Sequence, residues 1–209
     1  MSEGRRRRRS REQTRDRMLE AAVELLRTEG PGSLTTVRLT REAGIVQSGF
    51  YAHFKNPDHL QEELAEKSGQ ALRESMARWM AALRSDPKTD LDALTARFEE
   101  VLALFSEEAD LVDLFLRYRR SPDALGRVMG HLHTQLRADM FQYLRDRCGP
   151  PDALRPHLGT LGIHADILVA AILGVAEGVV EGRSADRRGA ARGLAALAMA
   201  PLRVLGLPV

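Results

Sequence analysis

Apolar residues recur at helical spacing along almost the whole chain. The first such stripe consists of Met18, Leu19, Ala22, Val23, Leu25 and Leu26. Its i, i+3, i+4 spacing is typical of an amphipathic helix. The alternation of apolar and polar residues that predicts a strand never persists between turn residues. The sequence therefore predicts an all-α protein.

Turn and capping residues divide this pattern into about nine helices, three of them short. The first helix ends at Gly30-Pro31-Gly32. Thr35, Asn56 and Asp90 are placed to accept backbone N–H groups at the starts of later helices. These later helices are expected at about residues 35–43, 47–53, 57–84, 91–105, 111–118, 121–147, 158–182 and 186–205. Ser121-Pro122 is expected to open the helix over 121–147, and Pro201 to kink the last one.

Residues 35–54 carry the most informative local pattern. Two short predicted helices meet at a tight turn that contains Gly44. This is the spacing of a helix-turn-helix, whose second helix enters the major groove of DNA. An amphipathic helical hairpin with no role in DNA binding is the alternative interpretation of this pattern taken alone.

The second short helix carries residue types that can contact DNA. Gln47, Ser48 and Gly49 stand at its leading end. Gln can form two hydrogen bonds to adenine, Ser can bond to either base type, and Gly permits close approach of the backbone to DNA. Behind them, Tyr51, His53 and Lys55 are better placed for phosphate contacts.

A longer set of residues fits a known pattern without a gap. The set is Arg15, Met18-Leu19, Ala21-Ala22, Leu25, Gly30, Thr35, Leu39, Ala43-Gly44-Ile45, Phe50-Tyr51, Phe54 and Leu60. With these residues, the first third of the chain resembles the N-terminal domain of the TetR-type transcriptional repressors. The resemblance implies a three-helix DNA-binding domain joined by a long fourth helix to a larger all-helical regulatory and dimerisation domain. We expect the boundaries at residues 12–72 and 73–209.

The resemblance also implies roles for individual residues. Gln47, Ser48 and Gly49 fall where family members contact bases, and Tyr51 falls where they contact the DNA backbone. Thr35, followed by Thr36, would cap the second helix and meet a phosphate.

The sequence departs from the family pattern in three respects. Val46 stands where a Ser or Thr usually caps the recognition helix, and the order Ser48-Gly49 exchanges the common Gly-then-hydroxyl order. The frequent Lys at the start of the fourth helix is Pro57 here, so Lys55 is expected to supply that phosphate contact.

Charge is concentrated at one end of the chain. The 31 basic and 29 acidic residues give a net charge of +2, but residues 1–17 hold eight Arg against three acidic residues, a net +5. Residues 1–11 are therefore expected to form a basic, disordered arm. Arg5, Arg6, Arg7, Arg8 and Arg9 could follow phosphates or enter a minor groove, and a solvated tail is the alternative.

Small residues recur near the C-terminus at close spacing. They are Ala170, Gly174, Gly178 and Gly182, followed by Ala191, Ala195 and Ala198. Such stripes let another helix approach closely, and the family resemblance implies a homodimer through the last two helices. A dimer would place two recognition helices on a palindromic operator. Close packing within one subunit is the alternative.

Methionine and aromatic residues in the middle helices suggest a pocket. The candidates are Met76, Trp79, Met80, Phe98, Leu102, Phe105, Phe115, Met129, His133 and Met140. Flexible Met side chains suit an adaptable site for a hydrophobic or aromatic small-molecule effector. The family resemblance places this site between the fourth helix and the helix over 121–147. The alternative for each of these residues is the ordinary core.

Composition limits the remaining classes of function. Cys148 is the only cysteine, the charged start is no secretory signal, and the apolar stretch over 161–180 is interrupted by charged and polar residues. His131 and His133 lack metal-ligand spacing, and no catalytic motif or cofactor fingerprint occurs. We therefore expect a cytoplasmic, ligand-responsive repressor without cofactor or metal. A constitutive DNA-binding regulator is the main alternative, and an all-α enzyme with an appended DNA-binding domain is a remote one.

Overall fold

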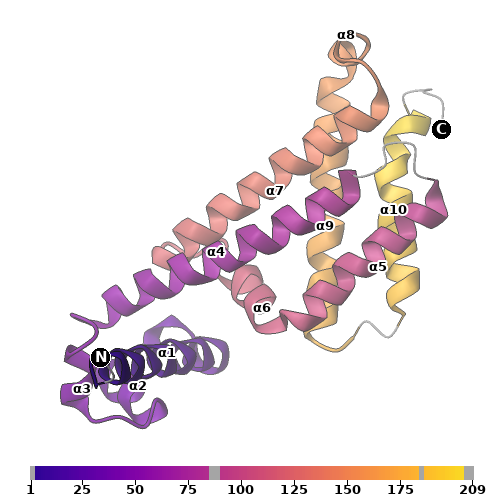
Figure 1. The fold of residues 1–209 in the computed structure, drawn as a ribbon. Helices are drawn as coiled ribbons and strands as arrows, with labels where there is room; N and C mark the ends of the chain where they lie inside the picture. Colours follow the sequence, from indigo (N-terminus) through magenta and orange to yellow (C-terminus); the bar gives the residue numbers. More distant parts are fainter. Residues whose placement is uncertain (1–2, 85–89, 184–185, 205–209) are drawn as a thin grey trace.

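The computed structural model describes residues 3–84, 90–183 and 186–204, and these contain helices but no strands (Figure 1). The α-helices are α1 (Glu3–Glu29), α2 (Thr36–Glu42), α3 (Gln47–Tyr51), α4 (Pro57–Arg84), α5 (Leu91–Glu107), α6 (Ala109–Tyr118), α7 (Ala124–Cys148), α8 (Pro151–Leu154), α9 (Leu158–Val180) and α10 (Arg187–Val204). Single 3-10 turns lie at Pro31–Ser33 and Arg155–His157. Of the ten α-helices in these residues, only α8 is shorter than five residues. The predicted all-α fold is confirmed.

The three predicted N-caps, Thr35, Asn56 and Asp90, are confirmed. The Thr35 hydroxyl accepts from the Arg38 N–H at 3.4 Å, and Asn56 Oδ1 accepts from the His59 N–H at 2.8 Å. Asp90 Oδ1 accepts from the Ala93 N–H at 2.8 Å. These side chains satisfy N–H groups that no helical carbonyl can reach, which fixes where each helix begins.

The predicted start of α7 is wrong by three residues. Helix α7 begins at Ala124 rather than at Ser121, because Asp123 is its N-cap and its Oδ1 accepts from the Gly126 N–H at 2.9 Å. Residues 121–123 fold back against the first turn of α7. A side chain at Gly126 would collide with the Ser121 carbonyl, so this turn requires glycine.

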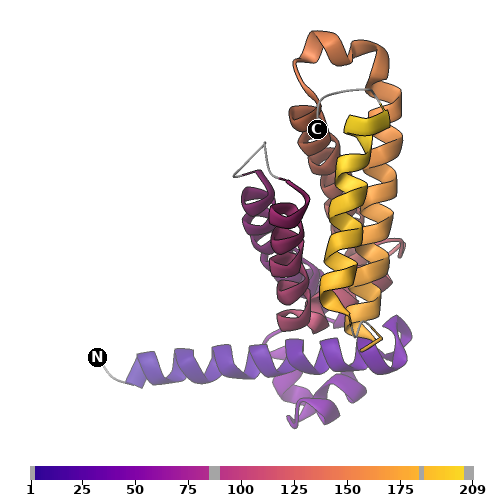
Figure 2. The same ribbon diagram turned by 90° about the vertical axis from the view of Figure 1, so that its right-hand side faces the viewer.

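The disordered arm expected at residues 1–11 is not found. Helix α1 begins at Glu3 and projects as a long rod beyond the neighbouring helices (Figure 2). Arginine is a good helix former and no proline interrupts this stretch, so the helix continues through the arginine run. The Arg5–Arg9 side chains lie outside the described residues.

Two hydrophobic cores lie along α4. The first joins α1–α3 and the start of α4 to α6 and the first half of α7. The second joins the end of α4 to α5, α7, α9 and α10. Met76 and Leu173 pack against both cores. The first core therefore contains more of the chain than the three-helix domain predicted from the sequence.

Helix α9 is apolar on more than its buried face. The segment Arg155–Val180 is long and apolar enough to cross a membrane, but the core helix of a soluble protein can be equally long and apolar. Leu161 and Leu168 are fully buried, whereas Ile163 and Ile167 on another face are exposed. The described chain therefore leaves an apolar surface of α9 without a partner.

One buried hydrogen bond ties α6 to α1. The hydroxyl of Tyr118 donates to the Leu26 carbonyl at 3.0 Å, and burial raises the pKa of this tyrosine. We expect Tyr118→Phe to lower the free energy of unfolding by about 1 kcal/mol, because the substitution removes one buried hydrogen bond and leaves the ring in place. Urea denaturation measures this change.

The control is Tyr51→Phe, because Tyr51 is exposed on α3. It should change the free energy of unfolding by less than about 0.5 kcal/mol. Equal effects of the two substitutions would contradict a stabilising role for the Tyr118 bond.

Candidate DNA-binding site

The turn between α2 and α3 is fixed by backbone geometry and by two phenylalanines. Gly44 has φ +63°, a conformation that favours glycine, and the Ile45 N–H donates to the Thr40 carbonyl at 2.9 Å. Phe50 and Phe54 are buried with ring centroids 5.7 Å apart. Because these rings anchor one face of α3 in the core, its opposite face is held toward solvent.

The predicted DNA contacts lie mostly on this outer face. Gln47, Ser48, Tyr51 and Lys55 are exposed, and Gly49 and His53 are half-buried. At the start of α2, Thr35 is exposed and Thr36 is half-buried. The structure thus brings the polar candidates of the helix-turn-helix to the surface, as DNA contact would require.

Two arginines of α1 bind the carbonyl ends of the two short helices. Arg11 Nη2 donates to the Ala52 carbonyl at 2.9 Å, beside the end of α3. Arg17 Nη2 donates to the carbonyls of Ala43 and Gly44 at the end of α2. The last carbonyls of a helix lack helical partners and carry partial negative charge, so a guanidinium group stabilises them.

A third arginine of α1, Arg15, contacts both α4 and the ring of Phe54. Its Nε donates to Glu63 Oε1 of α4 at 2.6 Å, and its guanidinium lies 4.8 Å from the centre of the Phe54 ring. The hydrogen bond to Glu63 raises the pKa of Arg15, and in turn lowers the pKa of Glu63. Arg15 therefore joins α1 and α4 at the base of α3. The sequence pattern counted these arginines as charge but did not indicate their carbonyl and carboxylate partners.

His53 lies beneath the recognition helix. Burial lowers its pKa, and the nearby positive charges of Arg11 and Arg15 lower it further. The buried Nδ1 of His53 has no hydrogen-bond partner in the structure. A lowered pKa favours the uncharged form of this histidine in the protein without DNA.

Val46 occupies the N-cap of α3 without capping it. Its backbone is extended, and its side chain makes no hydrogen bond to the first turn. The side chain is 72% exposed. An apolar residue thus stands at the tip of the recognition helix, immediately before Gln47.

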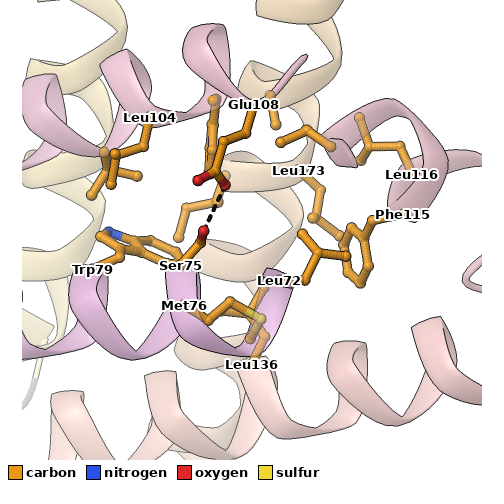
Figure 3. A pocket seen from close by; sticks show the side chains of 15 residues that line it. Leu72, Ser75, Met76, Trp79, Leu104, Glu108, Phe115, Leu116, Leu136 and Leu173 are labelled. Carbon is orange, nitrogen blue, oxygen red and sulfur yellow. Dashed lines mark hydrogen bonds between the residues drawn. The ribbon is translucent and has the colours of Figure 1, made fainter. Parts of the chain in front are cut away.

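An apolar cavity lies beside α4 in the larger part of the molecule (Figure 3). The centre of a water-sized sphere can reach about 50 Å³ of it, and the surrounding space free of protein atoms, open solvent at the mouth included, is about 600 Å³. Four of the predicted pocket residues line it: Met76, Trp79, Phe105 and Phe115. Helices α5, α6 and α9 supply most of the remaining wall, and α7 contributes only Leu136. The cavity therefore lies between α4 on one side and α5, α6 and α9 on the other, rather than between α4 and α7 as expected.

The other predicted pocket residues lie elsewhere. Met80, Phe98, Leu102, Met129 and Met140 are buried in the two cores and do not line this cavity. His133 lines a neighbouring polar cavity with Arg119 and Arg137. Methionine and aromatic residues follow the same helical spacing in a core and in a pocket, so the sequence pattern could not separate the two sets.

Few polar groups face the apolar cavity. The Ser75 hydroxyl donates to Glu108 Oε2 at 2.6 Å (Figure 3). Arg78 Nη2 donates to Glu108 Oε1 at 3.2 Å. Trp79 is buried and its Nε1–H has no hydrogen-bond partner in the structure. Apart from the Ser75–Glu108 pair and this indole N–H, the wall is hydrocarbon, which suits a mainly apolar ligand.

The residues predicted for a dimer interface divide into two groups. Ala170, Gly174 and Gly182 are exposed, but Gly178 and the α10 stripe of Ala191, Ala195 and Ala198 are buried within the chain. That stripe belongs to the core shared with α5 and α9, so the dimer prediction is wrong for it. Its small side chains permit close packing within one subunit.

Within residues 3–84, 90–183 and 186–204, no group of three or more His, Cys, Asp or Glu is arranged to hold a metal ion. Cys148 is buried, and this burial raises the pKa of its thiol. At a given pH, a thiol with a raised pKa has a smaller fraction in the reactive thiolate form.

The chain is similar to known regulators in sequence and in fold. Residues 18–64 match the family model described as "Bacterial regulatory proteins, tetR family". Over 171 residues the chain is 27% identical to the nucleoid occlusion factor SlmA of Vibrio campbellii, covering 78% of this chain and 80% of that protein. The family match over residues 18–64 contains all of α2 and α3.

Two solved structures illustrate the shared all-α fold. A TetR-like transcriptional regulator from Rhodococcus sp. RHA1 has a TM-score of 0.69 at 21% identity, covering 92% of this chain and 96% of that one. The fatty acid degradation regulator FadR from Bacillus halodurans has a TM-score of 0.58 at 15% identity, covering 91% and 96%. The match over residues 18–64 gives this chain the DNA-binding region of the TetR-type transcriptional regulators, and the structural matches show that the chain shares their all-α fold.

Proposed function

We propose that this regulator is a homodimeric repressor that leaves a palindromic operator when a small hydrophobic or aromatic effector enters the cavity beside α4. Residues 12–72 would bind DNA, and residues 73–209 would bind effector and partner. The observation that carries the proposal is the position of α4, whose start packs against the helix-turn-helix and whose middle lines the cavity. The proposal requires no cofactor and assigns no catalytic residue.

The first turn of α3 would contact bases. Gln47 and Ser48 supply exposed hydrogen-bonding groups, and Gly49 stands one residue behind them. A Cβ added at Gly49 would meet only Val46 Cγ2, at 3.8 Å, so alanine would fit the folded chain. Since glycine within a helix is less favourable than alanine, its presence here supports close approach by DNA.

We expect Gly49→Ala to weaken operator binding at least tenfold without lowering thermal stability. The added methyl group would separate α3 from the base pairs, whereas the alanine favours the helix by up to about 1 kcal/mol. Fluorescence anisotropy with an operator duplex and a thermal melt provide the two measurements.

Gly159→Ala in α9 is the matched control, because a Cβ there meets nothing within 4 Å. This control should bind the operator as the wild type does. Unchanged operator binding by Gly49→Ala would contradict the proposed contact surface.

The exposed apolar residues of α9 and α10 would form the dimer interface. Ile163 and Ile167 lie on the solvent side of α9, and Leu197 on that of α10, while the two helices pack side by side (Figure 2). Ala170 and Gly174 continue the α9 surface with small side chains. Exposed apolar patches of this kind mark protein–protein contacts.

We expect Ile167→Glu to convert the dimer to a monomer, since the substitution places a charge in the centre of an apolar interface. Sedimentation equilibrium would follow the change in mass. The control Val37→Glu alters an equally apolar, exposed residue on α2 and should leave the dimer intact. A dimeric Ile167→Glu variant would place the interface elsewhere.

The cavity would hold the effector. Ala176 contributes a small buried side chain to its wall, so Ala176→Leu should occupy part of the space. With the neutral fluorescent dye 1-aminoanthracene as probe, we expect saturable binding to the wild type and at least tenfold weaker binding to the variant. Operator affinity without dye should be unchanged.

Ala93→Leu on the exposed side of α5 is the control for this experiment and should bind the dye normally. Wild-type protein that does not bind the dye, or a variant that binds it equally well, would favour the alternative of a constitutive regulator.

A further inference from the structure

Val46 departs from two local rules at the tip of the recognition helix. An N-cap favours Ser, Thr, Asp or Asn, whose oxygen accepts a backbone N–H of the first turn, and valine cannot do so. Val46 is also the most exposed large apolar side chain in the described part of the chain, at 72%. Residues that break local rules without stabilising the structure are expected at functional positions.

The sequence around Val46 is polar and carries a net positive charge. Gln47 and Ser48 follow it and are exposed, and the exposed charged residues between the start of α2 and Lys55 are Arg41, Glu42 and Lys55. The site that a Cβ of Gly49 would occupy lies 3.8 Å from Val46 Cγ2, so the valine borders the open space above this glycine. A partner for this surface must be polyanionic and must offer a small apolar group next to hydrogen-bonding groups.

The major groove of DNA meets both requirements. Its apolar group is the C5-methyl of thymine, and apolar side chains contact that methyl in direct base recognition. An adenine in the neighbouring pair would offer the N6 and N7 groups to which glutamine bonds. The isolated valine is too small a patch for a protein interface, which generally needs a contiguous apolar surface.

We propose that Val46 is a specificity-determining residue that contacts the C5-methyl group of a thymine in each half-site, beside the base pair contacted by Gln47. The proposal rests on the assignment of α3 as the recognition helix. It predicts that this regulator distinguishes thymine from uracil and from cytosine at one symmetric position of its operator.

The experiment removes the DNA methyl group alone. The full-length protein first selects its operator from random duplexes. Thymidine is then replaced by deoxyuridine at one symmetric pair of positions at a time, and the dissociation constants are measured by anisotropy. At one such pair we expect about fourfold weaker binding per lost methyl contact, and roughly tenfold or more for the two half-sites.

Two variants assign the effect to Val46. Val46→Ala and Val46→Ser should bind the thymidine and deoxyuridine duplexes within about twofold of each other, because the contacting methyl groups of the protein are gone. Val46→Ser can cap α3, so a folding defect cannot explain its loss of discrimination. Val37→Ala, a change at another exposed valine, should retain the full thymidine preference.

The outcomes separate this inference from the proposed function. If no duplex is selected, or if Gln47→Ala binds the selected duplex as tightly as the wild type, the assignment of the recognition helix fails. If Gln47→Ala weakens binding but no thymidine is sensitive, Val46 does not contact a methyl group. A thymidine preference that persists in both Val46 variants also overturns the inference and leaves the recognition helix in place.

Discussion

The architecture depends on the continuity of α4. Its 28 residues run without a break from the helix-turn-helix core to the cavity, and Met76 packs against both cores. At 1.5 Å per residue the helix is about 42 Å long. Because its backbone hydrogen bonds make it stiff, a rotation of about 5° at one end moves the other by roughly 4 Å. A dimer whose two recognition helices must match one operator would be sensitive to a displacement of that size.

The helix-turn-helix is held by buried aromatic rings and by charged groups of α1, and not by the length of its own helices. Helix α3 has only five residues, too few to be stable alone, and two buried phenylalanines anchor one side of it. Arg11 and Arg17 bind the carbonyl ends of α3 and α2, and Arg15 joins α1 to α4. These guanidinium groups are engaged with the protein, so part of the basic charge at the start of the chain supports the fold.

Local chemistry decided which features could be predicted from the sequence. Thr35, Asn56 and Asp90 were predicted correctly as caps because each acts within three residues of itself. At α7 the sequence predicted a start at Ser121-Pro122, and only the folded turn against Gly126 makes Asp123 the N-cap. The cavity and the interface depend on which face of a helix meets another helix. Periodicity locates an apolar face but does not say what covers it, so Met129 in the core and Met76 at the cavity have the same pattern.

The helical start of α1 limits how many arginines can act together. A helix turns by about 100° per residue, so the five consecutive positions 5–9 surround the whole axis. A rigid rod can turn only about two of five such positions toward any single surface, whereas an unfolded arm could turn all of them. Were this segment to contact DNA, helical geometry rather than the count of arginines would set the number of phosphates that it neutralises, and with it the dependence of binding on salt concentration.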